Sequence, residues 1–144
     1  MGSLRSRILL FLAAAVGLAF LLDWLIETDR EKIEKLFETA RAAAVRGDVD
    51  SIMAQVDPAY SHDGNDFAAI RARIEQGLRQ SRPERVQLFD PRLELQDETA
   101  KYDVAILLVS SPSPQSPGTM KFDVSIGLAK RHDRWWIVSV DESP

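Results

Sequence analysis

The chain has 144 residues, of which 18 are basic and 22 acidic, giving a formal net charge of −4. This length allows one domain of ordinary size with a short extension. The acidic balance argues against binding nucleic acid through phosphate neutralisation, so we expect no nucleic-acid partner. Cysteine does not occur, which excludes disulfides, a thiol nucleophile and thiolate metal ligands.

The first distinctive segment is apolar. Residues 8–22 contain no charged side chain, and residues 24–26 extend the apolar stretch past Asp23. A helix over residues 8–26 would be roughly 28 Å long, close to the roughly 30 Å of a bilayer core. Trp24 belongs to a residue type that favours the headgroup region. The pattern predicts a transmembrane signal-anchor helix over residues 8–26, so the membrane is the first partner that we expect.

The flanking charges predict the orientation of this helix. Two arginines precede it, whereas acidic residues follow it closely. By the positive-inside rule, residues 1–7 form a cytoplasmic tail and residues 27–144 an extracytoplasmic domain, which is periplasmic if the source is bacterial. A cleaved signal peptide is one alternative, with Gly17-Leu18-Ala19 as its best cleavage motif. A buried core helix is another.

Downstream, apolar residues recur at helical spacing. The segment Thr28 to Glu31 has the spacing of a capping box and predicts the start of a helix that ends at Gly47. Asp48 is expected to cap a short second helix, which Asp57-Pro58 ends. After a loop over residues 59–64, a third helix has an apolar face made of Phe67, Ile70, Ile74 and Leu78.

From Glu84 the apolar residues alternate with polar ones, which is the period of strands. Asp90-Pro91 predicts a turn or bulge in the first of them. Further strands are expected over residues 101–110, 120–129 and 134–140, with a proline-rich hairpin loop over 110–118. Three helices followed by about four antiparallel strands indicate an α+β fold. The last strands are apolar on both faces, which predicts a partner surface and, most simply, a homodimer built sheet to sheet.

This order of elements resembles the nuclear transport factor 2-like superfamily, which includes ketosteroid isomerase and the SnoaL-like polyketide cyclases. The matching residues are Ile33 to Val45 with Gly47-Asp48, Met53 to Pro58, Phe67 to Ile74, and the tryptophan-rich strand Arg134 to Val138. The resemblance implies a cone fold, in which three helices pack on a curved, mainly antiparallel sheet around a pocket, and frequent dimerisation through the sheet. It implies no particular activity, because the superfamily contains isomerases, dehydratases, cyclases and non-catalytic scaffolds.

The candidate catalytic residues lie in the loop after the second helix and on two strands. Tyr60 and His62 occupy that loop, and histidine is the usual proton shuttle near neutral pH, although a solvated loop explains both residues equally well. Asp63 is poorly placed to orient His62, because neighbours on an extended chain point in opposite directions. Asp103 and Asp123 fall on the strand face opposite Tyr102 and Phe122. Either acid is a candidate base if that face lines the cone, and otherwise both belong to a charged outer face.

Trp135 and Trp136 are candidates for stacking on a ligand, and packing in the core or an interface is the alternative. We expect no metal site, because His62, Asp63 and Asp66 lack the spacing of zinc or calcium ligands. No dinucleotide, P-loop or nucleophile-elbow motif is present, so we also expect no cofactor.

Two functions remain open. The first is a membrane-tethered, non-catalytic binding or scaffold module with a cone-shaped pocket and an envelope protein as a candidate partner. The second is a small-molecule isomerase, dehydratase or cyclase of the SnoaL-like kind that uses His62 and a strand carboxylate. The anchor and the lack of a recognisable set of oxyanion donors favour the first.

Overall fold

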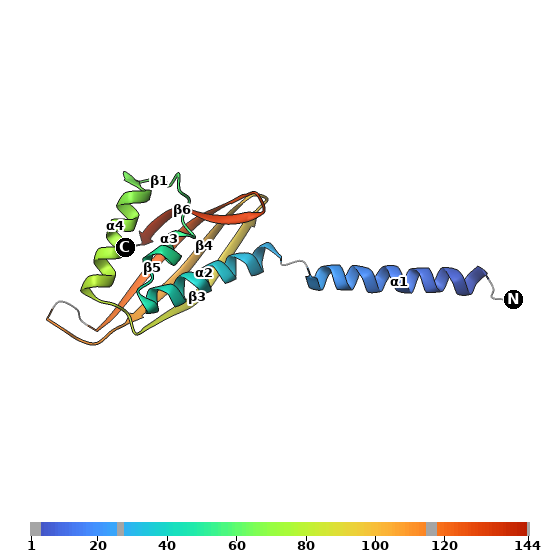
Figure 1. Cartoon of the computed structure of the whole chain (residues 1–144), viewed down its shortest axis with the longest axis horizontal. Helices are drawn as coiled ribbons and strands as arrows, with labels where there is room; N and C mark the ends of the chain where they lie inside the picture. Colours follow the sequence, from blue (N-terminus) through green and yellow to red (C-terminus); the bar gives the residue numbers. More distant parts are fainter. Residues whose placement is uncertain (1–3, 26–27, 115–117, 144) are drawn as a thin grey trace.

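The computed structural model describes residues 4–25, 28–114 and 118–143, and for residues 4–6 and 22–25 it describes the backbone alone. Figure 1 labels the elements in chain order. The helices are α1 (Leu4–Leu25), α2 (Asp29–Arg46), α3 (Val49–Met53) and α4 (Phe67–Gln80). The strands are β1 (Ser61–His62), β2 (Asn65–Asp66), β3 (Arg85–Gln96), β4 (Thr99–Val109), β5 (Thr119–Arg131) and β6 (Arg134–Ser143).

The first helix, α1, extends away from the rest of the molecule (Figure 1). The side chains of residues 7–21 are all exposed, and those of Phe11 and Phe20 are 81% and 73% exposed. Among the residues that the structure describes, no helix combines the length and the apolar character needed to cross a membrane. Ile26, the last residue of the predicted 8–26 segment, lies outside the described residues, as do the side chains of residues 22–25.

The ends of α2 and α3 follow from their capping residues. Thr28 and Glu31 form the predicted capping box, in which Thr28 Oγ1 accepts from the Glu31 N–H at 3.2 Å and Glu31 Oε2 accepts from the Thr28 N–H at 3.3 Å. Gly47 ends α2 in the left-handed conformation with φ of 69°, which glycine adopts without a Cβ penalty. Asp48 then accepts from the Ser51 N–H at 3.1 Å and caps α3.

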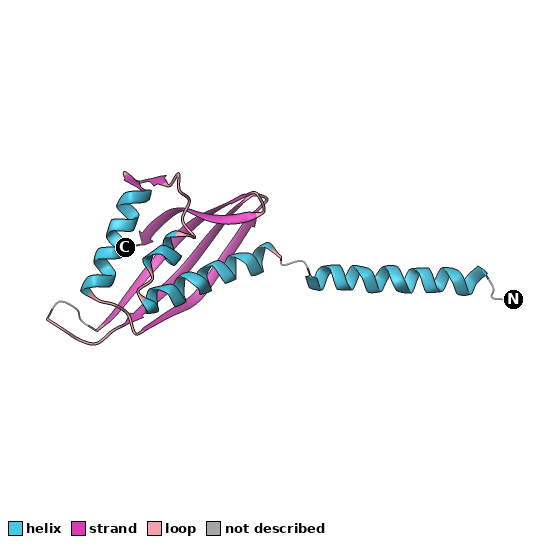
Figure 2. Ribbon diagram, viewed as in Figure 1, coloured by secondary structure: helices cyan, strands magenta, loops and turns pink. Residues whose placement is uncertain are grey.

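The long strands form one antiparallel sheet in the order β3-β4-β5-β6. The register of β3 shifts between Phe89 and Arg92, so the interruption predicted from Asp90-Pro91 is confirmed as a bulge. Helices α2, α3 and α4 lie over the same face of the sheet (Figure 2). This confirms the predicted α+β architecture of helices on a curved antiparallel sheet. Part of the proline-rich loop, residues 115–117, lies outside the described residues.

The loop predicted over residues 59–64 is partly wrong, because its second half belongs to a small hairpin. Ser61 and His62 pair with Asp66 and Asn65 in an antiparallel ladder. The two turn residues, Asp63 and Gly64, have φ of 52° and 78°, as a tight hairpin turn requires. Strands of two residues are too short to show an alternating pattern, although an Asp-Gly pair is a known hairpin signal.

The core lies between α2, α3 and the inner face of the sheet. Phe37 of α2 stacks on Tyr102 of β4 with ring centroids 4.0 Å apart and an interplanar angle of 14°. Ile33 of α2 is fully buried, and Leu128 of β5 is 1% exposed. Large apolar side chains therefore occupy the space between α2 and the sheet, within the cone where the resemblance implies a pocket.

The segment 55–57 closes the outer edge of β6. The Asp57 N–H donates to the Ile137 carbonyl at 2.9 Å, and the Ile137 N–H donates to the Gln55 carbonyl at 2.9 Å. The Asp57 side chain is 5% exposed, accepts from the Ala59 N–H at 2.9 Å and pairs with the guanidinium of Arg131. Burial raises the pKa of Asp57, but the hydrogen bonds from Ala59 and Arg131 outweigh it and lower the pKa below the ordinary 3.8.

We expect the Asp57→Asn substitution to lower the free energy of unfolding by about 1–2 kcal/mol at pH 7, because it removes the charge that Arg131 faces. Because the folded pKa is depressed, the aspartate contributes fully above its unfolded pKa, and the contribution is lost as pH falls through the folded pKa. The difference between the wild type and the variant should therefore shrink below about pH 4. Urea unfolding across this range measures it.

The control is Asp50→Asn, which removes an acid whose side chain is 82% exposed and pairs with Arg71. Its effect on unfolding at pH 7 should be smaller than that of Asp57→Asn. An Asp57→Asn variant as stable as Asp50→Asn would contradict the role given to the Asp57–Arg131 pair.

Candidate functional site

Two of the predicted catalytic residues, Tyr60 and His62, meet the end of β6. His62 Nε2 lies 2.7 Å from Asp141 Oδ1, and Tyr60 Oη accepts from the Val140 N–H at 3.1 Å. Burial raises the pKa of the Tyr60 hydroxyl above its ordinary value of 10.0. The partner of His62 is therefore Asp141, and Asp63 is an exposed turn residue. An imidazole–carboxylate pair of this kind is able to accept or donate a proton.

The two strand acids lie on the same face of the sheet as Asp141, and in the cross-strand row Ser125 of β5 stands between Asp103 and Asp141. Asp103 is paired with Ser125 and Asp123 with Ala105, and these positions alternate with the core residues Val104 and Val124. Directly paired residues share a face of the sheet. Both acids therefore lie on the outer face, opposite the helices. Their role as bases stays a prediction from the sequence, and the hydrogen bond of His62 is made to Asp141 and to neither of them.

Sequence reasoning missed Asp141, because the last strand was expected to end at Val140. The observed strand continues to Ser143. Asp141 stands 79 residues beyond His62, and nothing in the local pattern relates the two positions. Only the tertiary contact between β1 and the end of β6 brings them together.

The two candidate tryptophans occupy opposite faces of β6. Trp135 is 2% exposed, and its Nε1–H donates to Asp29 Oδ1 at 3.1 Å. Hydrogen bonds from Lys130 and Trp135 hold the pKa of Asp29 below its ordinary 3.8. Trp136 is half-buried beneath the guanidinium of Arg134, whose carbon lies 3.9 Å from the ring centroid. The ring of Trp135 is therefore packed in the core, and its indole N–H is bound at the start of α2.

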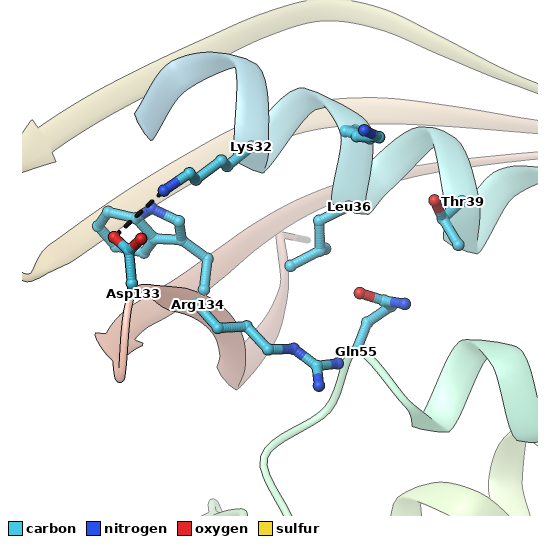
Figure 3. Close-up of a pocket in the computed structure, with 8 residues that line it drawn as sticks. Lys32, Leu36, Thr39, Gln55, Asp133 and Arg134 are labelled. Atoms are coloured by element: carbon cyan, nitrogen blue, oxygen red, sulfur yellow. Dashed lines mark hydrogen bonds and ion pairs between the residues drawn. The ribbon is translucent and has the colours of Figure 1, made fainter. Parts of the chain in front are cut away.

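A cleft of about 330 Å³ opens beside Trp135, between α2 and the start of β6, and we call it the α2–β6 cleft (Figure 3). Its lining residues are Lys32, Lys35, Leu36, Thr39, Gln55, Asp133, Arg134 and Trp135. Lys32 Nζ lies 3.2 Å from Asp133 Oδ1 across the opening, and this contact lowers the pKa of Asp133. In Figure 3 the Arg134 side chain points toward Gln55.

No described helix covers the outer face of the sheet (Figure 2). Apolar side chains lie on this face. Phe89 is paired with Ala105, and Leu107 lies at the next position on the same face of β4. We call Phe89, Ala105 and Leu107 the outer patch. Phe89 is 44% exposed, and the other two residues are half-buried. An uncovered apolar patch on a sheet is a candidate interaction surface.

Comparison with known proteins supports the fold. No protein-family model matches the sequence, and no curated protein matches it. Among solved structures, an NTF2-like protein from Cytophaga hutchinsonii superposes with a TM-score of 0.66 at 13% identity, over 81% of this chain and 98% of that one. A putative polyketide cyclase from Xanthomonas campestris superposes with a TM-score of 0.54 at 20% identity, over 80% and 91% of the two chains.

Bd1075 of Bdellovibrio bacteriovorus superposes with a TM-score of 0.66 at 14% identity, over 80% of this chain, and this chain spans 41% of the length of Bd1075. The chain thus has the NTF2-like cone fold, as the order of its elements predicted. At these identities the likeness concerns the fold alone. It does not carry an activity from one protein to another.

Grouped acidic, histidine and cysteine side chains suited to a metal ion are not found in the part of the chain that the structure describes. His132, the second histidine, is exposed in the turn between β5 and β6, where its φ is 52°. Three features of the described structure are therefore candidates for a function. They are the cluster of Tyr60, His62 and Asp141, the α2–β6 cleft and the outer patch.

We expect Tyr60→Phe to lower the free energy of unfolding by about 1 kcal/mol, because the Val140 N–H loses its acceptor while the ring stays in place. The Asp141→Asn variant should have a smaller effect on the free energy of unfolding. The Asp141 side chain is 56% exposed, so water can take the place of the lost carboxylate beside His62. Thermal or urea unfolding measures both. Equal effects would contradict the buried, structural role of the Tyr60 hydroxyl.

Proposed function

We propose that the protein is a membrane-tethered, non-catalytic binding or scaffold module. One observation carries this proposal: a helix with exposed apolar side chains precedes a domain whose interior is packed. The helix supplies attachment, and the domain offers its surfaces to partners. The N-terminus would be cytoplasmic and the domain extracytoplasmic, as the flanking charges predict.

The distribution of apolar side chains on α1 supports attachment to lipid. Large apolar residues are exposed along its described part, at Ile8, Leu9, Leu10, Phe11, Leu12, Val16, Leu18, Phe20 and Leu21. Their consecutive positions place them around the whole circumference of the helix. A helix that docks in a groove needs one apolar face, whereas lipid surrounds a helix on all sides. We therefore retain residues 8–26 as the proposed anchor.

The packed interior supports a role without catalysis. The stacked pair Phe37 and Tyr102 fills the space beneath α2. The strand acids lie on the outer face, and His62 lies beside the end of β6. A catalytic site needs acid–base groups that converge on one reacting atom. The sequence-predicted groups do not share such a position inside the cone.

The outer patch supports self-association. It lies on the sheet face opposite α2, α3 and α4, so a second copy can approach it without meeting a helix. Apolar residues at Phe89, Ala105 and Leu107 would be removed from water in a sheet-to-sheet dimer. We propose a homodimer of this kind, with an envelope protein as a further partner if the source is bacterial.

We expect the wild-type chain to sediment with membranes and to resist carbonate extraction. Leu18→Arg should release most of it, because a charged side chain near the middle of an inserted helix costs about 3 kcal/mol. The same change at Leu95, an exposed leucine of β3, is the matched control and should leave the protein in the membrane. Wild-type protein in the soluble fraction would contradict the anchor, and a C-terminal reporter tests the orientation.

For the dimer, we expect sedimentation of the full chain in density-matched non-ionic detergent to give two copies per particle. Phe89→Lys should yield monomers, because it places a charge within the outer patch. Leu95→Lys is the control, since Leu95 is 40% exposed but pairs with Ala100 on the helix-side face. A monomeric wild type at tens of micromolar, or equal effects of both variants, would contradict the proposal.

The second candidate function is a small-molecule isomerase, dehydratase or cyclase, and the pair His62–Asp141 is the observation that favours it. Here the strand carboxylate would be Asp141. The test is to incubate the protein with a panel of small carbonyl compounds and to use NMR to detect their conversion. Turnover that His62→Gln and Asp141→Asn both abolish, and that His132→Gln leaves intact, would establish this function and replace the scaffold proposal.

A further inference from the structure

We infer that the outer faces of β3 and β4 form a self-complementary strip, on which a second copy docks about a two-fold axis that runs parallel to the strands and between them. The inference rests on the proposed homodimer and deepens it, because the outer patch alone does not set how the two sheets are oriented. The strip combines the outer patch with four charged residues that follow it along the strands. We call these four residues the charged square: Arg92, Glu94, Lys101 and Asp103.

The bulge in β3 brings both parts of the strip onto one face of the sheet. Side chains of a regular strand alternate between faces, so Phe89 and Arg92, three positions apart, would point in opposite directions. Phe89 pairs with Ala105, whereas Arg92 pairs with Asp103, so the bulge adds one residue to β3 between the two pairs. Ala105 and Asp103 share the outer face of β4. Directly paired residues lie on the same face, so Phe89 and Arg92 are both on the outer face.

Opposite charges alternate within the charged square. Arg92 lies directly across from Asp103, and Glu94 lies directly across from Lys101. Along β4, Lys101 Nζ is 3.6 Å from Asp103 Oδ2. Arg92 and Glu94 are exposed and form no ion pair with another residue that the structure describes. The square is therefore electrically balanced on a chain of net charge −4, and two of its charges are free to pair with another molecule.

The position of the axis follows from where the outer patch ends. β3 is an edge strand of the sheet, and in the rows of the patch β5 carries Lys121 and Asp123, which are both exposed. The apolar part of the strip is therefore confined to β3 and β4. A two-fold interface brings the same surface of two copies together, so its axis passes through the centre of that surface. Here the centre is the boundary between β3 and β4.

An axis parallel to the strands matches every part of the strip. It lays β3 of one copy over β4 of the other, and the outer patch over the partner's outer patch. Arg92 then faces the partner's Asp103, and Glu94 faces the partner's Lys101. By symmetry each pair occurs twice. Facing sheets lie about 10 Å apart, which the long side chains of arginine, lysine and glutamate can bridge. Complementary charges of this kind fix the orientation of an interface more than its strength.

An axis across the strands matches the charges but not the apolar residues. Placed through the charged square, it would bring Arg92 to the partner's Glu94, which is also a favourable pair. The same axis would bring Phe89 to the partner's Gln96, because Gln96 and Thr99 form the next row on the outer face. The apolar residues would then meet polar ones. The parallel axis alone satisfies the outer patch and the charged square together.

Charge reversal in separate copies tests the inference, with the full chain in density-matched non-ionic detergent at low ionic strength. In its own dimer, Arg92→Glu places two acids together, and Asp103→Arg places two cations together. Each variant alone should dimerise about tenfold more weakly than the wild type, because both copies of an attraction become repulsions. In an equimolar mixture the two altered residues face each other as opposite charges. Mixed dimers should therefore form with about the wild-type affinity, as measured by sedimentation and by co-purification of differently tagged copies.

A second pair of variants, Glu94→Lys and Lys101→Glu, should behave in the same way and covers the case in which one of the first pair folds poorly. The matched control is Lys121→Glu with Asp123→Arg. These variants change the net charge by the same amounts on the same face of the sheet, but on β5, outside the strip. Alone and mixed, they should dimerise as the wild type does. High salt should reduce the differences among all the variants.

The outcomes separate the inference from the homodimer. A wild type that stays monomeric at tens of micromolar would overturn both. A dimeric wild type that neither pair of reversals weakens, or weakened variants that do not recover on mixing, would overturn the strip and leave the homodimer standing. Recovery of Arg92→Glu by Glu94→Lys in place of Asp103→Arg would show an axis across the strands and would also overturn the inference. Control variants that weaken the dimer equally would do the same.

Discussion

The outer edge of β6 is the constraint on which the arrangement of this domain depends. An edge strand presents N–H and C=O groups that need partners, and here the segment 55–57 provides them through two backbone hydrogen bonds to Ile137. This attachment fixes α3 and Gln55 beside the start of β6. It thereby sets the position of the α2–β6 cleft on one side and of Tyr60 and His62 on the other. The buried Asp57 carboxylate, held by Arg131, links the same segment to the β5–β6 turn.

The regular elements could be predicted from the sequence because their signals are local. The capping box at Thr28, the glycine at position 47 and the bulge at Asp90-Pro91 each depend on residues that are neighbours in the chain. The alternation in β5 likewise separated Val124 from Asp123 onto opposite faces. Caps, turns and alternation of this kind depend on neighbouring residues, so they favour the same local structure before the rest of the fold has formed.

The candidate site was less accessible to sequence reasoning, because its contacts join distant positions. His62 was selected for its chemistry, but its partner Asp141 comes from the end of β6. Trp135 was weighed as a stacking residue, and its indole N–H proves to be fixed by Asp29 at the start of α2. No pattern within either segment encodes these pairs. The cleft itself combines residues from α2, from the segment after α3 and from the β5–β6 turn, so it exists only once the tertiary structure has formed.

The contact between Asp29 and Trp135 also has a consequence for synthesis of the chain. The two residues are 106 positions apart, and Asp57 and Arg131 are 74 apart, so both contacts form only when the last two strands are present. During translation α1 and α2 leave the ribosome long before β6 exists. Pairings between distant residues form slowly, and partly made domains expose apolar surface. The N-terminal helix is therefore fully synthesised while the domain behind it is still unfolded.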